Sequence, residues 1–166
     1  VQFLVKRLTA ATNWLLNYPF TSHLRIGYFG EQAGADAALL AAAENPTAVG
    51  AVVSCSGKTC LTHEALSSLQ TPSLLIVGEN DLPAIAKNED AIEEIQAPYK
   101  ELKIIPNASR QFKETGAFEE IARLASHWFK QHLSSVTYPE TGANVYKSLY
   151  RNHANPGMNQ QITTIK

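Results

Sequence analysis

Three side chains in this 166-residue sequence have types and positions that could do chemistry: Gln32, Asp81 and Arg110. Gln32 lies between Gly30 and Gly34, and glycines on both sides of a strand-to-helix turn let the backbone fold sharply enough to lift the middle side chain above a sheet. Gln32 cannot act as a nucleophile, because a neutral amide is too weak an acid for a neighbouring base to activate by deprotonation. It is either a polar residue at a turn whose glycines serve packing, or an amide that reads the polar groups of a ligand.

Asp81 and Arg110 each follow a predicted strand, and we expect them to form an ion pair. A buried carboxylate without a partner is costly, and a guanidinium within reach would neutralise it. This interpretation predicts that their charged groups lie within about 6 Å of each other. The alternative is that Arg110 binds a ligand.

The remaining reactive side chains favour structural roles. Cys55, Cys60 and His63 offer three soft ligands within nine residues, but a structural zinc site takes four and the paired-cysteine spacing is absent, so no metal site and no cofactor are predicted. Cys55 is expected to be a small core residue. His127 and His132 are predicted to lie on the outer side of the last helix.

The elements that would position these side chains alternate between strand and helix. Strands are predicted at 26–29, 49–54, 73–77 and 102–105, and helices at 3–18, 33–44, 64–69, 88–96 and 117–133. Such alternation builds a parallel sheet through right-handed crossovers, so the expected fold class is α/β, a three-layer sandwich with a mostly parallel four-stranded sheet. Because sites in such sheets lie at the carboxyl ends of the strands, Gln32, Asp81 and Arg110 are expected along one edge.

Two helices have an apolar stripe that predicts their buried face. In the first helix the stripe consists of Phe3, Leu4, Leu8, Ala11, Leu15 and Tyr18, broadened by Trp14 and Leu16. In the last helix it consists of Phe118, Ile121, Ala125 and Trp128. Residues 1–133 are therefore predicted to form one domain. Residues 134–166 lack a sustained apolar period and are predicted to be a tail or arm.

Composition excludes several classes of partner. The sequence is 45% hydrophobic and 17% charged, and its 14 basic and 15 acidic residues are well mixed, which gives no electrostatic footprint for nucleic acid or an anionic membrane. No apolar run approaches the roughly 20 residues that span a bilayer. Two cysteines are too few for a disulfide scaffold. We expect a cytoplasmic protein.

Four segments together resemble the carboxyl-terminal half of an α/β-hydrolase, and within that fold the dienelactone hydrolase-like branch. They are the strand and turn from Ile26 to Gly34, the strand Ala51-Val52-Val53-Ser54, the strand and loop from Leu74 through Gly78 to Asp81, and the helix from Glu119 to Phe129. The resemblance covers about residues 8–133.

The resemblance implies a role for each position of the predicted edge. Gln32 occupies the nucleophile position, Asp81 the acid position, Arg110 the histidine position, and Ala33 the position of an oxyanion-binding backbone N–H. Only the acid is retained, and arginine cannot replace histidine because it does not release its proton near neutral pH.

Two functional hypotheses follow from these substitutions. The first is a non-catalytic pseudoenzyme that binds a ligand or partner, with Gln32 and Arg110 as ligand-binding residues. The second is an ester or lactone hydrolase completed by another chain or by a missing amino-terminal half. The resemblance implies a small ester or lactone-like ligand. The fold's earlier strands are missing, so the first strand would have an open edge, and we expect a homo-oligomer or a partner to cover it.

Overall fold

The computed structural model describes residues 1–134. The predicted tail, apart from Ser134, lies outside the described residues. The elements in chain order are α1 (Gln2–Asn17), β1 (Ile26–Glu31), α2 (Ala33–Glu44), β2 (Val49–Cys55), α3 (His63–Ser68), β3 (Ser73–Gly78), α4 (Leu82–Glu94), β4 (Lys100–Ile105) and α5 (Ala117–Leu133).

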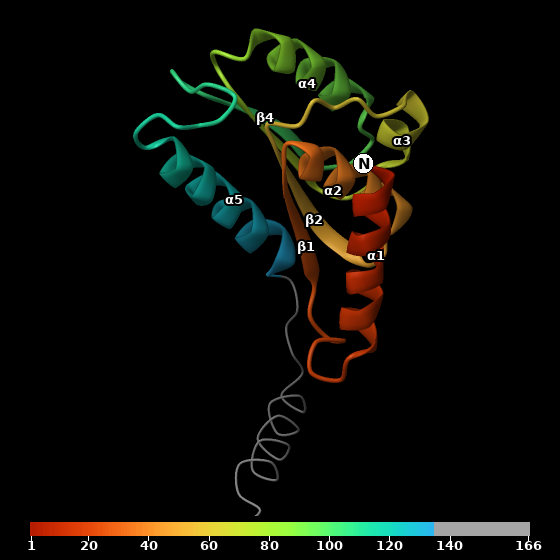
Figure 1. Cartoon of the computed structure of the whole chain (residues 1–166). Coiled ribbons are helices and arrows are strands. Elements are labelled where there is room, and N and C mark those ends of the chain that lie inside the picture. The colour runs from red at the N-terminus through yellow and green to blue at the C-terminus, as the bar shows by residue number, and fades with distance from the viewer. Residues whose placement is uncertain (135–166) are drawn as a thin grey trace, which may run out of the picture. The chain divides into compact units, whose positions relative to one another are not determined.

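The four strands form one parallel sheet in the order β1-β2-β3-β4. Figure 1 shows α5 on one side of this sheet and α1 and α2 on the other. One buried cluster joins α1, α2, α3 and α4 to one face of the sheet, and a second joins α5 to the opposite face. Every residue of β2 and β3 is buried, as expected for strands covered on both faces. The predicted three-layer α/β architecture is confirmed.

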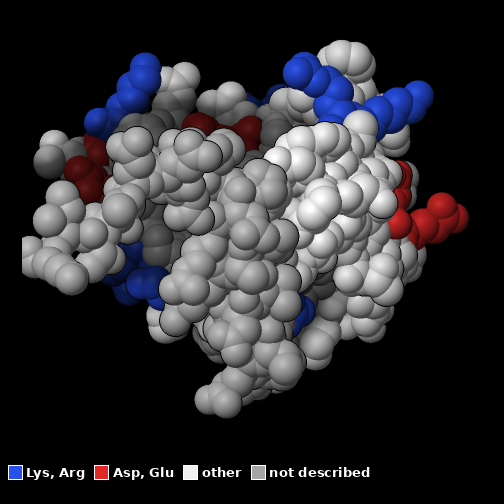
Figure 2. Space-filling model, turned by 90° about the horizontal axis from the view of Figure 1, so that it is seen from below, with Lys and Arg blue, Asp and Glu red and all other residues white. Residues whose placement is uncertain are grey.

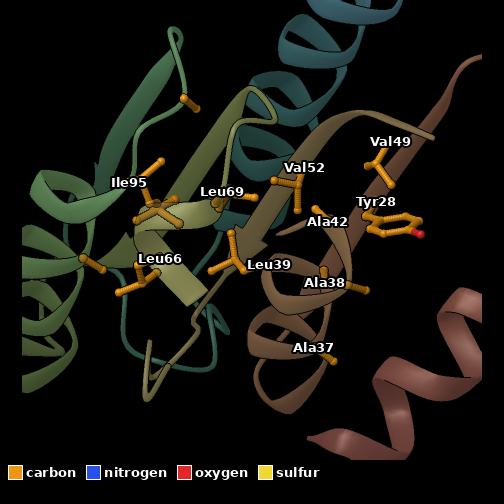
Figure 3. Close-up of a cluster of buried hydrophobic side chains, with 14 of the residues drawn as sticks. Tyr28, Ala37, Ala38, Leu39, Ala42, Val49, Val52, Leu66, Leu69 and Ile95 are labelled. Atoms are coloured by element: carbon orange, nitrogen blue, oxygen red, sulfur yellow. The ribbon is translucent and has the colours of Figure 1, made fainter. Parts of the chain in front are cut away.

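The first cluster depends on the small side chains of α2. Five of its alanines are almost completely buried, namely Ala35, Ala37, Ala38, Ala41 and Ala42. The cluster places Leu39 and Ala42 with Val52 of β2 (Figure 3). Small residues let the helix axis lie close to the sheet, which fixes the position of the turn that precedes α2. This layer also contains the hydroxyls of Thr12 and Tyr28, which lie 2.6 Å apart and form a hydrogen bond with each other.

The buried face of α1 differs from the predicted one. Phe3 and Trp14 are 70% and 61% exposed, whereas Val5 and Thr12 are buried. Thr12 is buried because its hydroxyl is paired with that of Tyr28. Trp14 stays at the surface, where its ring stacks on Tyr18 with centroids 4.9 Å apart.

Two predictions about the faces of α5 are wrong. Phe118 is 56% exposed, and His132, expected on the outer side, is 9% exposed. The imidazole of His132 packs against Trp128 and Tyr99, with ring centroids 4.2 and 5.1 Å away. Burial lowers the pKa of His132, and the nearby Glu101 partly opposes that shift.

The start of α4 also differs, because the helix begins at Leu82 rather than Asn88. Asp81 is its N-cap, and Pro83 occupies the first turn, where a missing N–H costs nothing. The earlier start brings the first turn of α4 beside the loop that follows β3.

The surface of the described unit carries charges of both signs. On the face in Figure 2, several Lys, Arg, Asp and Glu side chains are visible toward the rim. β1 ends the sheet on one side, and Phe29 on this strand is 50% exposed, so the predicted open edge is confirmed within residues 1–134. In the same residues no helix has the length and apolar character needed to cross a membrane.

Candidate functional site

The turn between β1 and α2 has the sharp geometry that its glycines predict. Gln32 has φ 51° and ψ −115°, a backbone conformation that side chains rarely adopt, and its side chain is exposed. A Cβ at Gly30 would lie 2.1 Å from the carbonyl oxygen of Gly34, so only glycine fits there. A Cβ at Gly34 would meet no atom of the described residues within 4 Å. The turn therefore requires Gly30, and Gly34 contributes its close-lying carbonyl.

Backbone contacts hold this turn to the next strand. The N–H of Gln32 donates to the carbonyl of Cys55 at the end of β2, at 2.9 Å. Ala33 is the first residue of α2, where backbone N–H groups have no partner within the helix. The assignment of this N–H to oxyanion binding stays a prediction.

Asp81 and Arg110 lie together, as predicted. Arg110 Nε is 4.0 Å from Asp81 Oδ2, which confirms the ion pair but leaves the two groups beyond hydrogen-bond distance. Asp81 Oδ1 accepts a hydrogen bond from the N–H of Ala84 at 3.3 Å, so this carboxylate also caps α4. Ser56 Oγ donates to the carbonyl of Arg110 at 2.9 Å and ties the loop of Arg110 to the end of β2.

A half-open pocket of about 170 Å³ lies beside this pair. Its lining residues come from the loop after β2, the start of α4 and the loop after β4: Ser56, Gly57, Lys58, Asp81, Pro83, Ala84, Lys87 and Arg110. Gln32 is not among them. The structure thus brings Asp81 and Arg110 into one pocket and places Gln32 at a separate turn.

The sequence analysis missed Ser56, Lys58 and Lys87. The signal for Lys58 was its place beside Gly57 in a loop at the carboxyl end of a strand, where sites in parallel sheets form. Lys87 had no such signal, because it lies on a helix whose start was placed too late.

A buried carboxylate, Asp36 of α2, supports the loop that carries Lys58. Asp36 is 5% exposed, and its Oδ1 accepts a hydrogen bond from the N–H of Thr59 at 3.0 Å. Burial raises the pKa of Asp36, while hydrogen bonds from the Thr59 and Cys60 backbone and the charge of Lys58 partly lower it. The signal for Asp36 was a charged residue in the middle of an alanine-rich segment, whereas the other charged residue of α2, Glu44, ends the helix.

The other candidate residues lie outside any reactive arrangement. Cys55 is buried, and desolvation together with the charge of Glu31 raises its pKa to about 12, so its thiol is protonated near neutral pH. His63 lies on α3, with Nδ1 3.2 Å from Glu94 Oε2. Within the described part of the chain no three His, Cys, Asp or Glu side chains form a group that could hold a metal ion.

Comparison with known proteins places this architecture among hydrolases. A model of the dienelactone hydrolase family matches residues 1–133. The crystal structure of a dienelactone hydrolase from Anabaena variabilis is 51% identical, with a TM-score of 0.75, over 78% of this chain and 59% of that one. An esterase structure from Pyrococcus furiosus shares the fold at 19% identity, with a TM-score of 0.66, over 78% of this chain and 62% of that one.

Two curated Mycobacterium tuberculosis proteins, from different strains, match at 41% identity over 133 residues. Their names describe them as phosphoribosyl transferases. The match covers 80% of this chain and 30% of each of those proteins. The chain therefore spans less than a third of the length of the curated relatives that it matches.

Proposed function

The chain belongs to the dienelactone hydrolase family, and from this premise we propose that it is a non-catalytic member, a pseudoenzyme, that binds a ligand at the carboxyl edge of its sheet. The observation that carries the proposal is the pairing of Asp81 with Arg110 at 4.0 Å. The family resemblance assigns Arg110 to the position of the catalytic histidine. An arginine there holds its proton and cannot pass it between a nucleophile and a leaving group.

The turn at Gln32 supports the same proposal. It has the backbone geometry that exposes a nucleophile, but the exposed side chain is a neutral amide. The one thiol near the turn, Cys55, is buried and has a raised pKa. The transferase named in the Mycobacterium tuberculosis relatives is not part of the proposal, because the match spans only 30% of those proteins.

The second candidate function is an ester or lactone hydrolase that another chain completes. The observation in its favour is the open edge of β1, together with the fact that the chain spans 59% of the Anabaena variabilis enzyme. A second copy of the chain, or a further segment, would pair with this edge and could supply the missing groups.

The exposed free thiol of Cys60 fits a reducing compartment, which supports a cytoplasmic location.

Turnover of a short-chain aryl ester and a small lactone, with labelling by serine-directed and cysteine-directed probes, tests the proposal. We expect the unaltered chain to turn over both substrates no faster than Gln32→Ala and to leave the serine-directed probe unbound. A rate that falls by about 100-fold or more in Gln32→Ala or Asp81→Asn would overturn the proposal. Turnover lost in Cys55→Ala would also overturn it and would identify Cys55 as the nucleophile.

The molar mass in solution distinguishes the two candidates further. A dimer that Phe29→Lys converts to monomer would support pairing across β1, because an inward or edge charge blocks strand addition. A monomer without turnover would leave the non-catalytic proposal and remove completion by a second copy.

A further inference from the structure

The pocket beside Asp81 and Arg110 contains more positive charge than its own carboxylate can balance. Among the described residues, three cationic side chains line it, Lys58, Lys87 and Arg110, and Asp81 is the one acidic lining residue. The three cations come from the loop after β2, from α4 and from the loop after β4. Their gathering is therefore a product of the fold and not of one charged run in the sequence.

Carboxylates of the described unit pair only weakly with these three cations. Arg110 has its ion pair with Asp81 at 4.0 Å, and 45% of its side chain is exposed. Among residues 1–134 neither lysine lies within ion-pair distance of a carboxylate; Lys87 Nζ is 3.8 Å from the sulfur of Cys60. The charge of Lys58 acts on the buried Asp36, and Lys87 also lines a neighbouring pocket together with Asp90 and Glu94.

The backbone around the pocket is held in place by hydrogen bonds from several elements. Asn88 Nδ2 donates to the carbonyl of Gly57 at 3.1 Å, and Thr59 Oγ1 donates to the carbonyl of Lys87 at 3.1 Å, so the loop after β2 is tied to α4. Ser56 ties the same loop to Arg110, and Asp36 ties it to α2. A pocket held in this way loses little conformational entropy when a ligand binds.

We infer that this pocket binds the phosphate group of a small phosphomonoester. Two lysines without an ion pair match the two negative charges that a phosphomonoester carries near neutral pH, and the partly exposed guanidinium adds donors suited to phosphate oxygens. A pocket of about 170 Å³ has room for a phosphate group, since a cavity of about 150 Å³ holds benzene, and its open side leaves the organic substituent free to extend toward solvent. The N-terminus of α4 is not the binding element, because Asp81 already caps it.

The inference deepens the proposed function, on which it rests, by naming the class of ligand. Calorimetric titration of the full chain with phenyl phosphate at low ionic strength tests it, with inorganic phosphate and benzoate as the other probes. We expect phenyl phosphate to bind, and Lys58→Gln or Lys87→Gln to weaken binding about 10-fold or more, as loss of a charged hydrogen bond does. Lys6→Gln on the exposed surface of α1 is the matched control and should bind like the unaltered chain.

A second readout reports on the pocket itself. Cys60 is exposed and Cys55 is buried, so a neutral maleimide should modify Cys60 alone. Because Lys87 Nζ lies 3.8 Å from Cys60 Sγ, phenyl phosphate held by Lys87 should slow this modification in the unaltered chain and not in Lys87→Gln. This comparison separates binding in the pocket from binding elsewhere on the surface.

Each outcome bears on the inference. Inorganic phosphate that binds as tightly as phenyl phosphate would identify free phosphate as the source of the group, still at this site. Benzoate binding as tightly, no binding of either phosphate, or equal weakening in Lys6→Gln would overturn the inference. If the chain binds neither phosphate and turns over no ester, the inference is wrong but the proposed function stands. If the chain turns over an ester and this turnover depends on Gln32 or Asp81, the proposed function is wrong.

Discussion

The two glycines of the Gln32 turn should respond in opposite ways to the same substitution. Gly30→Ala places a methyl group 2.1 Å from the carbonyl oxygen of Gly34 and 2.8 Å from the Cα of Ala35. Both obstacles are backbone atoms, so the turn must open to admit the methyl group. Forcing extra atoms into a packed site costs about 1–3 kcal/mol, and rigid backbone puts Gly30→Ala at or above the upper end, about 3 kcal/mol.

Gly34→Ala is the matched control, because it adds the same methyl group four residues later. No atom of the described residues lies within 4 Å of the added carbon, and position 34 is helical. Alanine is favoured over glycine in a helix by up to about 1 kcal/mol, so this variant should be equally stable or slightly more stable.

Urea unfolding followed by far-ultraviolet circular dichroism measures both variants. The midpoint should fall for Gly30→Ala and stay or rise for Gly34→Ala, with unchanged dependence on urea concentration. Two variants that agree within about 0.5 kcal/mol would refute the described turn, since surface substitutions usually stay in that range. A large loss in Gly34→Ala alone would mean that another part of the protein packs on this side of α2.

Two further predictions concern buried titratable groups. Asp36→Ala should lower the free energy of unfolding by about 1–3 kcal/mol, because it leaves the buried N–H of Thr59 without an acceptor. Burial raises the pKa of Asp36 above 3.8 in the folded state. The favourable contribution of this carboxyl to the free energy of unfolding is therefore present below pH 3.8 and is lost as pH rises through the folded-state pKa. Over that pH interval, Asp36→Asn should become more stable relative to the unaltered chain. Burial lowers the pKa of His132 below 6.5, so its contribution is present above pH 6.5 and is lost as pH falls through the folded-state pKa. His132→Phe should remove this loss of stability at acidic pH, as measured by thermal unfolding at a series of pH values. A variant whose stability changes with pH in parallel with that of the unaltered chain would contradict the prediction made for it.

The sequence predicted those features that depend on local pattern. The bounds of α2 and α5 agree with the structure, since a run of small residues between Gly30 and Pro46 and a strongly amphipathic segment after Gly116 leave little choice. The parallel sheet followed from the alternation of strands and helices. The Asp81–Arg110 pair followed from the shared edge of that sheet and the cost of an isolated buried charge.

The misses are features that depend on partners far apart in the chain. Periodicity placed Trp14 on the buried face of α1 and did not include Thr12, but Tyr28 supplies the hydroxyl that makes burial of Thr12 favourable. His132 is buried because the aromatic rings of Trp128 and Tyr99 surround it, and Tyr99 comes from another loop. The spacing of Lys58, Lys87 and Arg110 in the sequence contains no hint that they line one pocket.

The turn at Gln32 has a structural consequence that does not depend on a nucleophile. It fixes where α2 begins, and Asp36, in the first turns of α2, accepts the hydrogen bond that holds the loop of Lys58. The same loop holds Arg110 through Ser56. A displacement of α2 that Gly30→Ala causes should therefore reach the pocket and weaken phosphate binding, although Gly30 does not line it, whereas Gly34→Ala should leave binding unchanged. Under the proposed non-catalytic function, the strained turn would serve to position the pocket.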